Sequence, residues 1–341
     1  MKKHKAPTVK DVAEVARVSI GTVSSVLHGK LTVNAKIRQR VLAAIAEVGF
    51  TPNAIAQSMR LGSTRTIGVV VREIGIPSVA AFVSASQDVL YENGYATLLA
   101  SFGDRRDRQI DLFGALMRRK VDGFIVSQNP EIDEEIEVLL RKISCPLVLV
   151  EREHPIWADA VLVDHFDAIR RATEYLLRLG HRRIGMLVGD PNLFPSRQRI
   201  AGFKSAHEML GVPIDPALMM TERVTADYGY EQTIRMTQMH DVPTAIVAGG
   251  PLLSGVLRAL ARTRMRIPED MSIVATSNSD LAELTVPAIS TERWNAHAVG
   301  VEAAKVLLQR IGKRASVEEP RRITIRAEFS LRDSCAPPRA C

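Results

Sequence analysis

From Thr66 onward, short runs rich in β-branched apolar residues alternate with longer stretches in which apolar residues recur at helical spacing. Strand–helix alternation of this kind predicts an α/β fold, in which helices cover both faces of parallel sheets. The alternation is too long for one open sheet, so two subdomains are expected. The predicted strands are 66–72, 123–127, 147–151, 184–188, 245–248 and 272–275, and the predicted helices lie near 79–93, 106–119, 167–179, 197–210, 226–238, 252–264 and 296–311.

The first 50 residues have a different pattern, which predicts three short helices. Thr8, Ser19 and Asn34 are suitable N-caps for them, and Gly29 and Gly49 are suitable stops for the second and third. Two short helices joined by a tight turn and braced by a third form the arrangement that places its second helix in the DNA major groove. Helical spacing alone leaves a second interpretation open, a small bundle that binds another protein.

Charge is concentrated at the same end of the chain. Residues 1–65 hold eleven Lys and Arg against three acidic residues, a net +8, so the other 276 residues sum to −1 of the total +7. Neutralisation of phosphates supplies most non-specific affinity for nucleic acid. The asymmetry therefore favours a DNA-binding headpiece over a solvated basic tail.

Composition and motifs narrow the class of protein further. No apolar run approaches the roughly 20 residues that span a bilayer, and no signal-peptide segment follows the basic N-terminus. Three cysteines (Cys145, Cys335 and Cys341) lack metal-ligand spacing, which is typical of a reduced, cytoplasmic protein with no metal. No phosphate loop, dinucleotide fingerprint, metalloprotease motif or nucleophile elbow is present, so no enzyme activity and no cofactor are expected.

Two groups of polar residues could be read as catalytic, but a structural role is expected for both. His181 in LGHRRI is expected to be a structural turn residue. Asp164, Asp167 and Glu174 are expected to form a solvated helix start. A solute-binding receptor with the same core is disfavoured, because such a protein needs an export signal and no DNA-binding headpiece.

Long stretches resemble the lac repressor (LacI/GalR) family. The match begins with TVKDVAEVARVSIGTVSSVLHG (8–29) and RQRVLAAIAEVGFTPNAIAQSMRLGSTRTIGVVV (38–71). It continues with DGFIVS, TEYLLRLGHRRIGMLVG, RIAGF, PTAIVAGG, RIPEDMSIVATSNSDLAEL and AEFSLRDS, so it covers nearly the whole chain. The resemblance implies a transcriptional regulator, expected to be a repressor, that binds a pseudo-palindromic operator as a homodimer.

The resemblance also implies a domain plan. A helix-turn-helix headpiece (1–50) is followed by a hinge helix and linker (51–65) and by a periplasmic-binding-protein-like core (66–335) with a small-molecule effector between two lobes. A loose tail (336–341) ends the chain. Lobe one is expected to hold 66–162 and 293–321, and lobe two 163–292 and 322–335.

Matched family positions give the expected DNA contacts. Thr22 and Ser24 would contact phosphates, and Ile20, Gly21 and Ser25 would face base edges. The full expected set is Thr8, Ile20, Gly21, Thr22, Ser24, Ser25, His28, Asn53, Ala56 and Met59, of which the last three lie in the hinge helix and Met59 would act as an apolar wedge in the minor groove.

Two departures alter this expectation. The family usually has Arg where Ser25 stands and Asn where His28 stands. Arg can grip guanine bidentately for roughly 1–3 kcal/mol of discrimination, and Ser cannot. We therefore expect an operator that differs from the family's consensus, with more reliance on DNA deformability. Two roles remain open for His28, a contact with a phosphate or an ordinary surface residue without a DNA contact.

Effector positions match less well. Arg197 matches a basic residue that commonly binds hydroxyls or carboxylates, but Val224 replaces an aromatic residue and Ser277-Asn278 replaces paired acids. One interpretation is an acidic or less polar metabolite bound by Arg197, Asp167, Ser277, Asn278 and Val224. The alternative is a core that has lost its effector and serves as a dimerisation platform.

Overall fold

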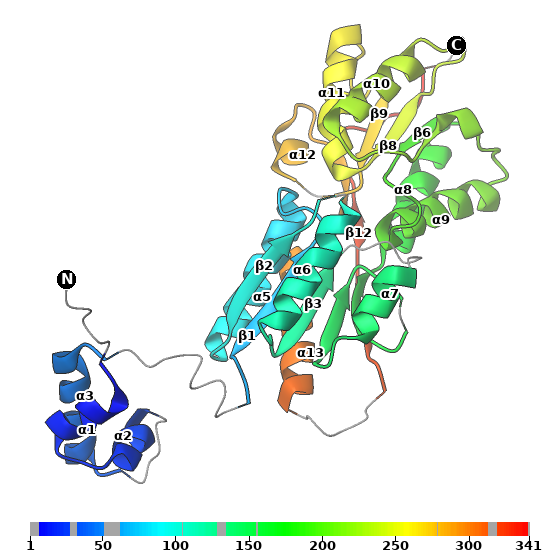
Figure 1. The fold of residues 1–341 in the computed structure, drawn as a ribbon. Helices are drawn as coiled ribbons and strands as arrows, with labels where there is room; N and C mark the ends of the chain where they lie inside the picture. The colour runs from blue at the N-terminus through cyan, green and yellow to red at the C-terminus, as the bar shows by residue number, and fades with distance from the viewer. Residues whose placement is uncertain are drawn as a thin grey trace. The chain divides into compact units, whose positions relative to one another are not determined.

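A computed structural model describes residues 7–27, 33–50, 62–103, 105–127, 134–154, 156–277, 279–312 and 319–339 (Figure 1). The chain divides into two compact units, Met1–Thr64 and Arg65–Cys341, and each is considered by itself below. The predicted hinge helix falls within residues 51–61, outside the described residues.

The first unit contains the three predicted helices, α1 (Val9–Ala16), α2 (Ile20–Leu27) and α3 (Ala35–Val48). The predicted caps are confirmed at both ends of α3: the Asn34 side chain accepts from the Lys36 amide at 2.9 Å, and Gly49 takes the left-handed conformation (φ 64°). The Thr8 amide donates to the Asp11 carboxylate at 2.7 Å before α1. A small apolar core joins the helices: Val12, Ala13, Ala16, Val23, Val26, Val41, Ala44 and Phe50.

The second unit contains two six-stranded sheets. The first is wholly parallel, with strand order β11-β5-β4-β3-β1-β2. Side chains alternate between its faces, so Ile67 and Val69 pack under α5 and α13 while Val70 packs under α6 and α7. The elements of this first lobe are β1 (Thr66–Val71), α5 (Pro77–Glu92), β2 (Ala96–Ser101), α6 (Arg106–Arg118), β3 (Gly123–Ser127), α7 (Glu134–Arg141), β4 (Leu147–Val150), β5 (Asp159–Val163), α13 (Ala296–Gly312) and β11 (Arg322–Ile325).

The second sheet has the order β12-β10-β9-β8-β6-β7, and only β12 runs antiparallel to its neighbour. Helices α8 and α9 cover one face, and α10, α11 and the short α12 cover the other. The elements of this second lobe are α8 (His165–Arg178), β6 (Ile184–Leu187), α9 (Phe194–Met209), a 3-10 turn (Pro216–Leu218), β7 (Met219–Met220), α10 (Ala226–Thr237), β8 (Ala245–Ala248), α11 (Gly250–Thr263), β9 (Ser272–Ala275), α12 (Asp280–Leu284), β10 (Ser290–Arg293) and β12 (Glu328–Ser330).

Two pairs of helices pack closely at positions where a glycine places no side chain between them. A Cβ on Gly202 of α9 would lie 2.3 Å from the Phe166 carbonyl oxygen of α8. A Cβ on Gly300 of α13 would lie 2.2 Å from the Phe82 carbonyl oxygen of α5. Both positions therefore require glycine for the observed packing.

All six predicted strands and all seven predicted helices of the core are confirmed, within three residues at each end. The expected lobe boundary after residue 321 is wrong, because β11 pairs in parallel with β5 and so belongs to the first sheet. The chain returns to the second lobe only after Ala327, which still packs in the first. Among the described residues, no helix has both the length and the apolar character needed to cross a bilayer.

The expected loose tail is also wrong for residues 336–339, which pack on the second lobe. The Ala336 amide donates to the Ser272 hydroxyl, which donates in turn to the Ala336 carbonyl, both at 3.1 Å. The Arg339 guanidinium lies 2.8 Å from the Asp270 carboxylate. Beside this segment, His181 is buried between the Thr244 hydroxyl (2.7 Å) and the Ala336 carbonyl (3.0 Å), in the structural role expected of it.

Candidate functional site

Helix α2 buries one face and exposes the other. Val23 and Val26 lie in the small core, whereas Ile20 keeps 52 % of its surface exposed. Gly21 is also exposed, and the remaining predicted contact residues on this helix, Thr22, Ser24 and Ser25, are half-buried. The predicted base-reading positions therefore share the accessible side of the helix. An isoleucine that is half exposed contributes little to the headpiece core, so its side chain is available to a partner.

The turn before α2 is held by residues of all three helices. Arg17 ends α1 in the left-handed conformation (φ 51°), and the Ser19 hydroxyl accepts from the Thr22 amide at 3.1 Å. From α3, the Arg40 guanidinium donates to the carbonyls of Ala16 (2.5 Å) and Arg17 (3.3 Å). These carbonyls are the negative end of α1, so a cation there is favourable. This contact ties the end of α1, and the start of the turn that leads to α2, to α3.

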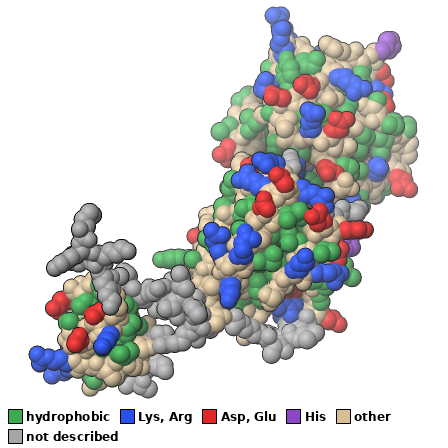
Figure 2. All heavy atoms as spheres, viewed as in Figure 1, with side chains coloured by type: hydrophobic (Ala, Val, Ile, Leu, Met, Phe, Trp, Pro, Cys, Tyr) green, Lys and Arg blue, Asp and Glu red, His purple; other side chains and the backbone are tan. Residues whose placement is uncertain are grey.

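Charge on the two units follows the sequence expectation. Lys10, Arg17, Lys36 and Arg38 are among the described basic residues of the headpiece. On the core, Figure 2 shows Lys and Arg side chains interspersed with Asp and Glu over the face in view. Four expected DNA contacts, His28, Asn53, Ala56 and Met59, lie outside the described residues.

Two expected effector residues lie beyond the carboxyl ends of second-lobe strands, the edge where open α/β sheets bind ligands. Val224 and Ser196 lie against Gly189, which follows β6, since a Cβ there would meet their side chains at 2.4 and 3.2 Å. Ser277 follows β9 and lies over Gly250, whose added Cβ would meet the Ser277 hydroxyl at 2.5 Å. The third residue of this edge, Asn278, lies outside the described residues.

The two charged residues expected to bind an effector already have protein partners. Arg197 is 36 % exposed and lies 3.2 Å from the Glu153 carboxylate. Asp167 lies 2.7 Å from both Arg170 and Arg171 on its own helix. Its burial raises the pKa of the Asp167 carboxyl, but the two arginines outweigh burial and lower the pKa below its usual range.

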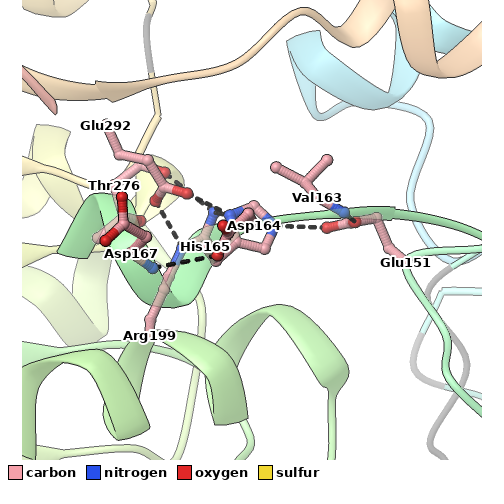
Figure 3. Close-up of polar contacts among 8 residues, drawn as sticks. All are labelled: Glu151, Val163, Asp164, His165, Asp167, Arg199, Thr276 and Glu292. Carbon is pink, nitrogen blue, oxygen red and sulfur yellow. Dashed lines mark hydrogen bonds and ion pairs between the residues drawn. The ribbon is translucent and has the colours of Figure 1, made fainter. Parts of the chain in front are cut away.

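A cluster of ionisable groups that the sequence did not reveal lies at the start of α8 (Figure 3). His165 is fully buried; its Nε2 lies 2.5 Å from the Glu151 carboxylate and its Nδ1 contacts the Glu292 carboxylate. The Arg199 Nε donates to Glu292 at 2.8 Å, and its Nη2 donates to the Thr276 carbonyl at 3.0 Å. The Val163 amide donates to Glu151 at 2.8 Å.

Two carboxylates and one guanidinium surround the His165 ring, since the Arg199 Nη2 also lies 3.1 Å from its Nδ1. Each ring nitrogen faces a carboxylate oxygen, and a neutral imidazole has only one N–H to donate. Burial and the nearby Arg199 lower the pKa of His165, but Glu292 and Glu151 outweigh them, so the pKa is raised. Burial raises the pKa of Glu292, but Arg199 and His165 outweigh it and lower the pKa. Both shifts favour the charged forms, a protonated His165 and an ionised Glu292.

Arg199 was missed because the resemblance pointed to Arg197. Residues two apart on a helix face nearly opposite sides, so only one of these arginines can turn inward. In α9 the inward one is Arg199, with 14 % of its side chain exposed. No local signal in the sequence marks the cluster, because Glu292 lies among polar residues in β10 (Ser290–Arg293). The other members are separated by too much sequence for any motif to link them.

Comparison with known proteins agrees with both units. Residues 8–53 match the family described as bacterial regulatory proteins, lacI family, and residues 173–335 match a periplasmic binding protein-like domain. The HTH-type transcriptional repressor PurR of Haemophilus influenzae is 28 % identical over 329 residues, covering 96 % of this chain and 98 % of PurR.

Two solved structures extend the comparison. A LacI family regulator from Enterococcus faecium with bound ribose is 30 % identical, with a TM-score of 0.71, over 80 % of this chain and all of that one. The lac repressor dimer bound to operator and an anti-inducer has a TM-score of 0.86 at 24 % identity, over 97 % of this chain and all of that one, and supports the fold. By headpiece, core and full-length similarity, the chain belongs to the LacI family of bacterial transcriptional regulators.

Proposed function

We propose that this protein is a transcriptional repressor that binds a pseudo-palindromic operator as a homodimer, in the cytoplasm and without enzyme activity. The observation that carries the proposal is the accessible face of α2, which a rigid three-helix headpiece presents on a turn braced by Arg40. A helix held in this way can enter the major groove without the cost of ordering it first.

The headpiece residues then divide by role. Ile20 and Gly21 lie where they can meet base edges, and Ile20 can contact only a thymine methyl. Ser25 is the third residue proposed to face base edges, and its short side chain offers one hydroxyl. Thr22 and Ser24 would contact phosphates, which set position and register rather than sequence. In the same proposal, Thr8 and His28 flank the reading helix, and Asn53, Ala56 and Met59 of the hinge enter the minor groove.

Dimerisation is proposed at α12 and the loop after it. Leu281, Leu284 and Val286 lie within six residues and keep 41 %, 80 % and 98 % of their surface exposed. Large apolar side chains exposed this close together mark an interaction surface. A second copy of the chain can cover them about a two-fold axis, which matches the symmetry of a pseudo-palindromic site.

A small metabolite is the proposed effector, bound near the carboxyl ends of the second-lobe strands. Ser277, Asn278 and Val224 would line its site, and Arg197 and Asp167 would border it. The relative from Enterococcus faecium was solved with ribose, which supports a sugar or a related compound. Arg197 and Asp167 are already paired with protein groups, and this favours the alternative of an effector-independent core that serves to dimerise.

DNA binding is tested by selection from a random-sequence duplex pool with the full chain, followed by fluorescence anisotropy on the selected duplex. We expect nanomolar-range affinity, at least about a thousandfold above a scrambled duplex, and a steep decline with salt. Equal affinity for both duplexes at every salt concentration would refute sequence-specific binding.

The effector is tested by a thermal-shift screen of sugars, sugar acids and sugar phosphates on the full chain. Binding to the folded state alone raises its melting temperature. A compound that stabilises the wild type but not Arg197→Ala supports the retained site. A screen without any stabilising compound supports the effector-independent alternative.

A further inference from the structure

We propose that His165, Glu151, Glu292 and Arg199 form a proton-held tie between the two lobes, and that loss of its proton lowers operator affinity. For its DNA readout this inference rests on the proposed function. We name these four residues the interlobe tie.

The tie joins the two sheets through one imidazole. Glu151 follows β4 of the first sheet, while Glu292 lies in β10 of the second. His165 begins α8, directly after the chain leaves the first sheet at Val163. Arg199 reaches the same point from α9, which covers the second sheet. Figure 3 shows His165 between Glu151 on one side and the Glu292–Arg199 pair on the other.

Neighbouring contacts dock α9 on the first lobe at the same place. The Phe194 side chain, at the start of α9, is buried in the first-lobe core beside α6 and α7. One turn on, Arg197 pairs with Glu153, two residues after Glu151. Glu151 itself has a left-handed backbone (φ 56°), a strained conformation for a residue with a side chain, which its surroundings must hold in place.

Charge balance makes the proton essential to the tie. The groups that face His165 are Glu151 from the end of β4, Glu292 from β10 and Arg199 from α9, and its own helix adds Asp164 at the cap. Trp294 packs its ring edge against the imidazole and does not titrate. A neutral His165 would leave two carboxylates facing one guanidinium in a buried site, and an unbalanced buried charge is unfavourable. The tie then has to loosen or admit water.

The direction of the pH dependence follows from the pKa values. The pKa of His165 is raised, so its stabilisation is complete below the ordinary value of 6.5 and is lost as pH rises through the raised pKa. The pKa of Glu292 is lowered, so its contribution is lost only as pH falls through that lowered value. The tie therefore holds at pH values below 6.5 and weakens as pH rises through the raised pKa of His165.

The tie also joins the lobe at which the chain enters from the headpiece to the lobe that carries the proposed dimer contact. The chain enters the core at Arg65, directly before β1 of the first lobe. The exposed apolar residues proposed to hold the dimer, at α12, lie on the second lobe. A change in how the lobes are joined therefore changes how two headpieces are presented to the two half-sites of an operator.

The test measures affinity of the full chain for the selected duplex at constant salt, from about pH 6, below the ordinary pKa of histidine, to about pH 10. We expect the wild type to weaken at least about fivefold, the lower end of typical coupling between sites. His165→Gln should lose this dependence, and Glu151→Gln should move it to lower pH. Glu153→Gln, which removes the adjacent surface pair, is the matched control and should keep the wild-type profile.

Subtraction of the His165→Gln profile also removes any contribution from headpiece groups such as His28. Equal pH profiles of operator affinity in the wild type and His165→Gln would overturn the proposal. The melting temperature of the full chain over the same pH range gives an independent readout: the wild type should fall with rising pH more steeply than Glu151→Gln. An equal dependence of melting temperature on pH in the two proteins would overturn the tie itself. This measurement needs no DNA, so it can be made even if the selection yields no duplex. Failure of the selection would refute only the proposed function. If His165→Gln does not fold, Glu151→Gln decides the result.

Discussion

The headpiece and the core use their polar residues in opposite ways. In the headpiece, apolar residues fill the interior, and the residues that we expect to recognise DNA lie on the accessible side of α2. In the core, a connected cluster of polar residues is internal, with His165, Glu151 and Glu292 nearly or fully buried. The difference indicates that one unit acts through a preformed surface and the other through the way in which its two halves are joined.

Removal of residues 1–62 should have the largest effect on DNA binding. If recognition belongs to the surface of the first unit, the remaining chain will lose all measurable affinity for the selected duplex, because the core is nearly neutral in sum. The second unit is compact by itself, so it should remain a folded dimer. Anisotropy and sedimentation velocity measure the two properties. If the truncated chain still binds the selected duplex, DNA recognition does not belong to the first unit alone.

Arg199→Met should have the largest effect on core stability. It leaves Glu292 buried without its guanidinium, which should cost about 3–5 kcal/mol of unfolding free energy. Urea unfolding at neutral pH measures the loss. The matched control is Arg105→Met, which breaks an exposed pair with Asp107 and should change nothing measurable. A small effect from both would show that the buried cluster contributes no more than a surface pair.

Arg40→Met should have a moderate effect confined to the headpiece. It removes the two hydrogen bonds to the end of α1, worth about 1 kcal/mol at this solvent-accessible position. Affinity for the selected duplex should fall by about tenfold if the α1–α2 angle matters for docking. Gln39→Met, on the exposed side of the same helix, serves as the control. Equal affinities for the two variants would show that the brace has no role in recognition.

Gly21→Ala should have the smallest effect on stability, and a favourable one. An added Cβ would lie 3.6 Å from the Ser19 hydroxyl, an ordinary contact, and alanine in a helix gains about 0.5–1 kcal/mol over glycine. The headpiece should therefore become more stable while affinity for the selected duplex falls, because a methyl enters the surface that meets DNA. A gain in both properties would indicate that Gly21 does not approach the duplex.

The sequence allowed correct predictions where a structural element depends on neighbouring residues, but not where it depends on distant ones. The caps at Thr8, Asn34 and Gly49 act within a few residues, so the headpiece helices could be predicted closely. Strands buried on both faces, such as β3 and β9, also stand out as short apolar runs. The edge strand β2 keeps much of its surface exposed and lacks that signal.

The failures share one cause, which is dependence on distant partners. Strand β11 joined the wrong lobe in the prediction because only its pairing with β5, far back in the sequence, assigns it. The resemblance pointed to Arg197, and nothing local corrected that choice, since the carboxylate that binds Arg199, Glu292, lies 93 residues away. Ala336 and its neighbours were expected to be loose because nothing local shows that Ser272 holds them.

The claim that α2 reads bases is tested most directly by repeating the selection with Ile20→Ala. We expect the duplexes that it selects to differ from those of the wild type at one base pair in each half-site, with the rest of the site unchanged, since only the contact at position 20 is lost. Gln39→Ala is the matched control and should select the wild-type sequence. If Ile20→Ala also selects the wild-type sequence, α2 does not read bases through Ile20.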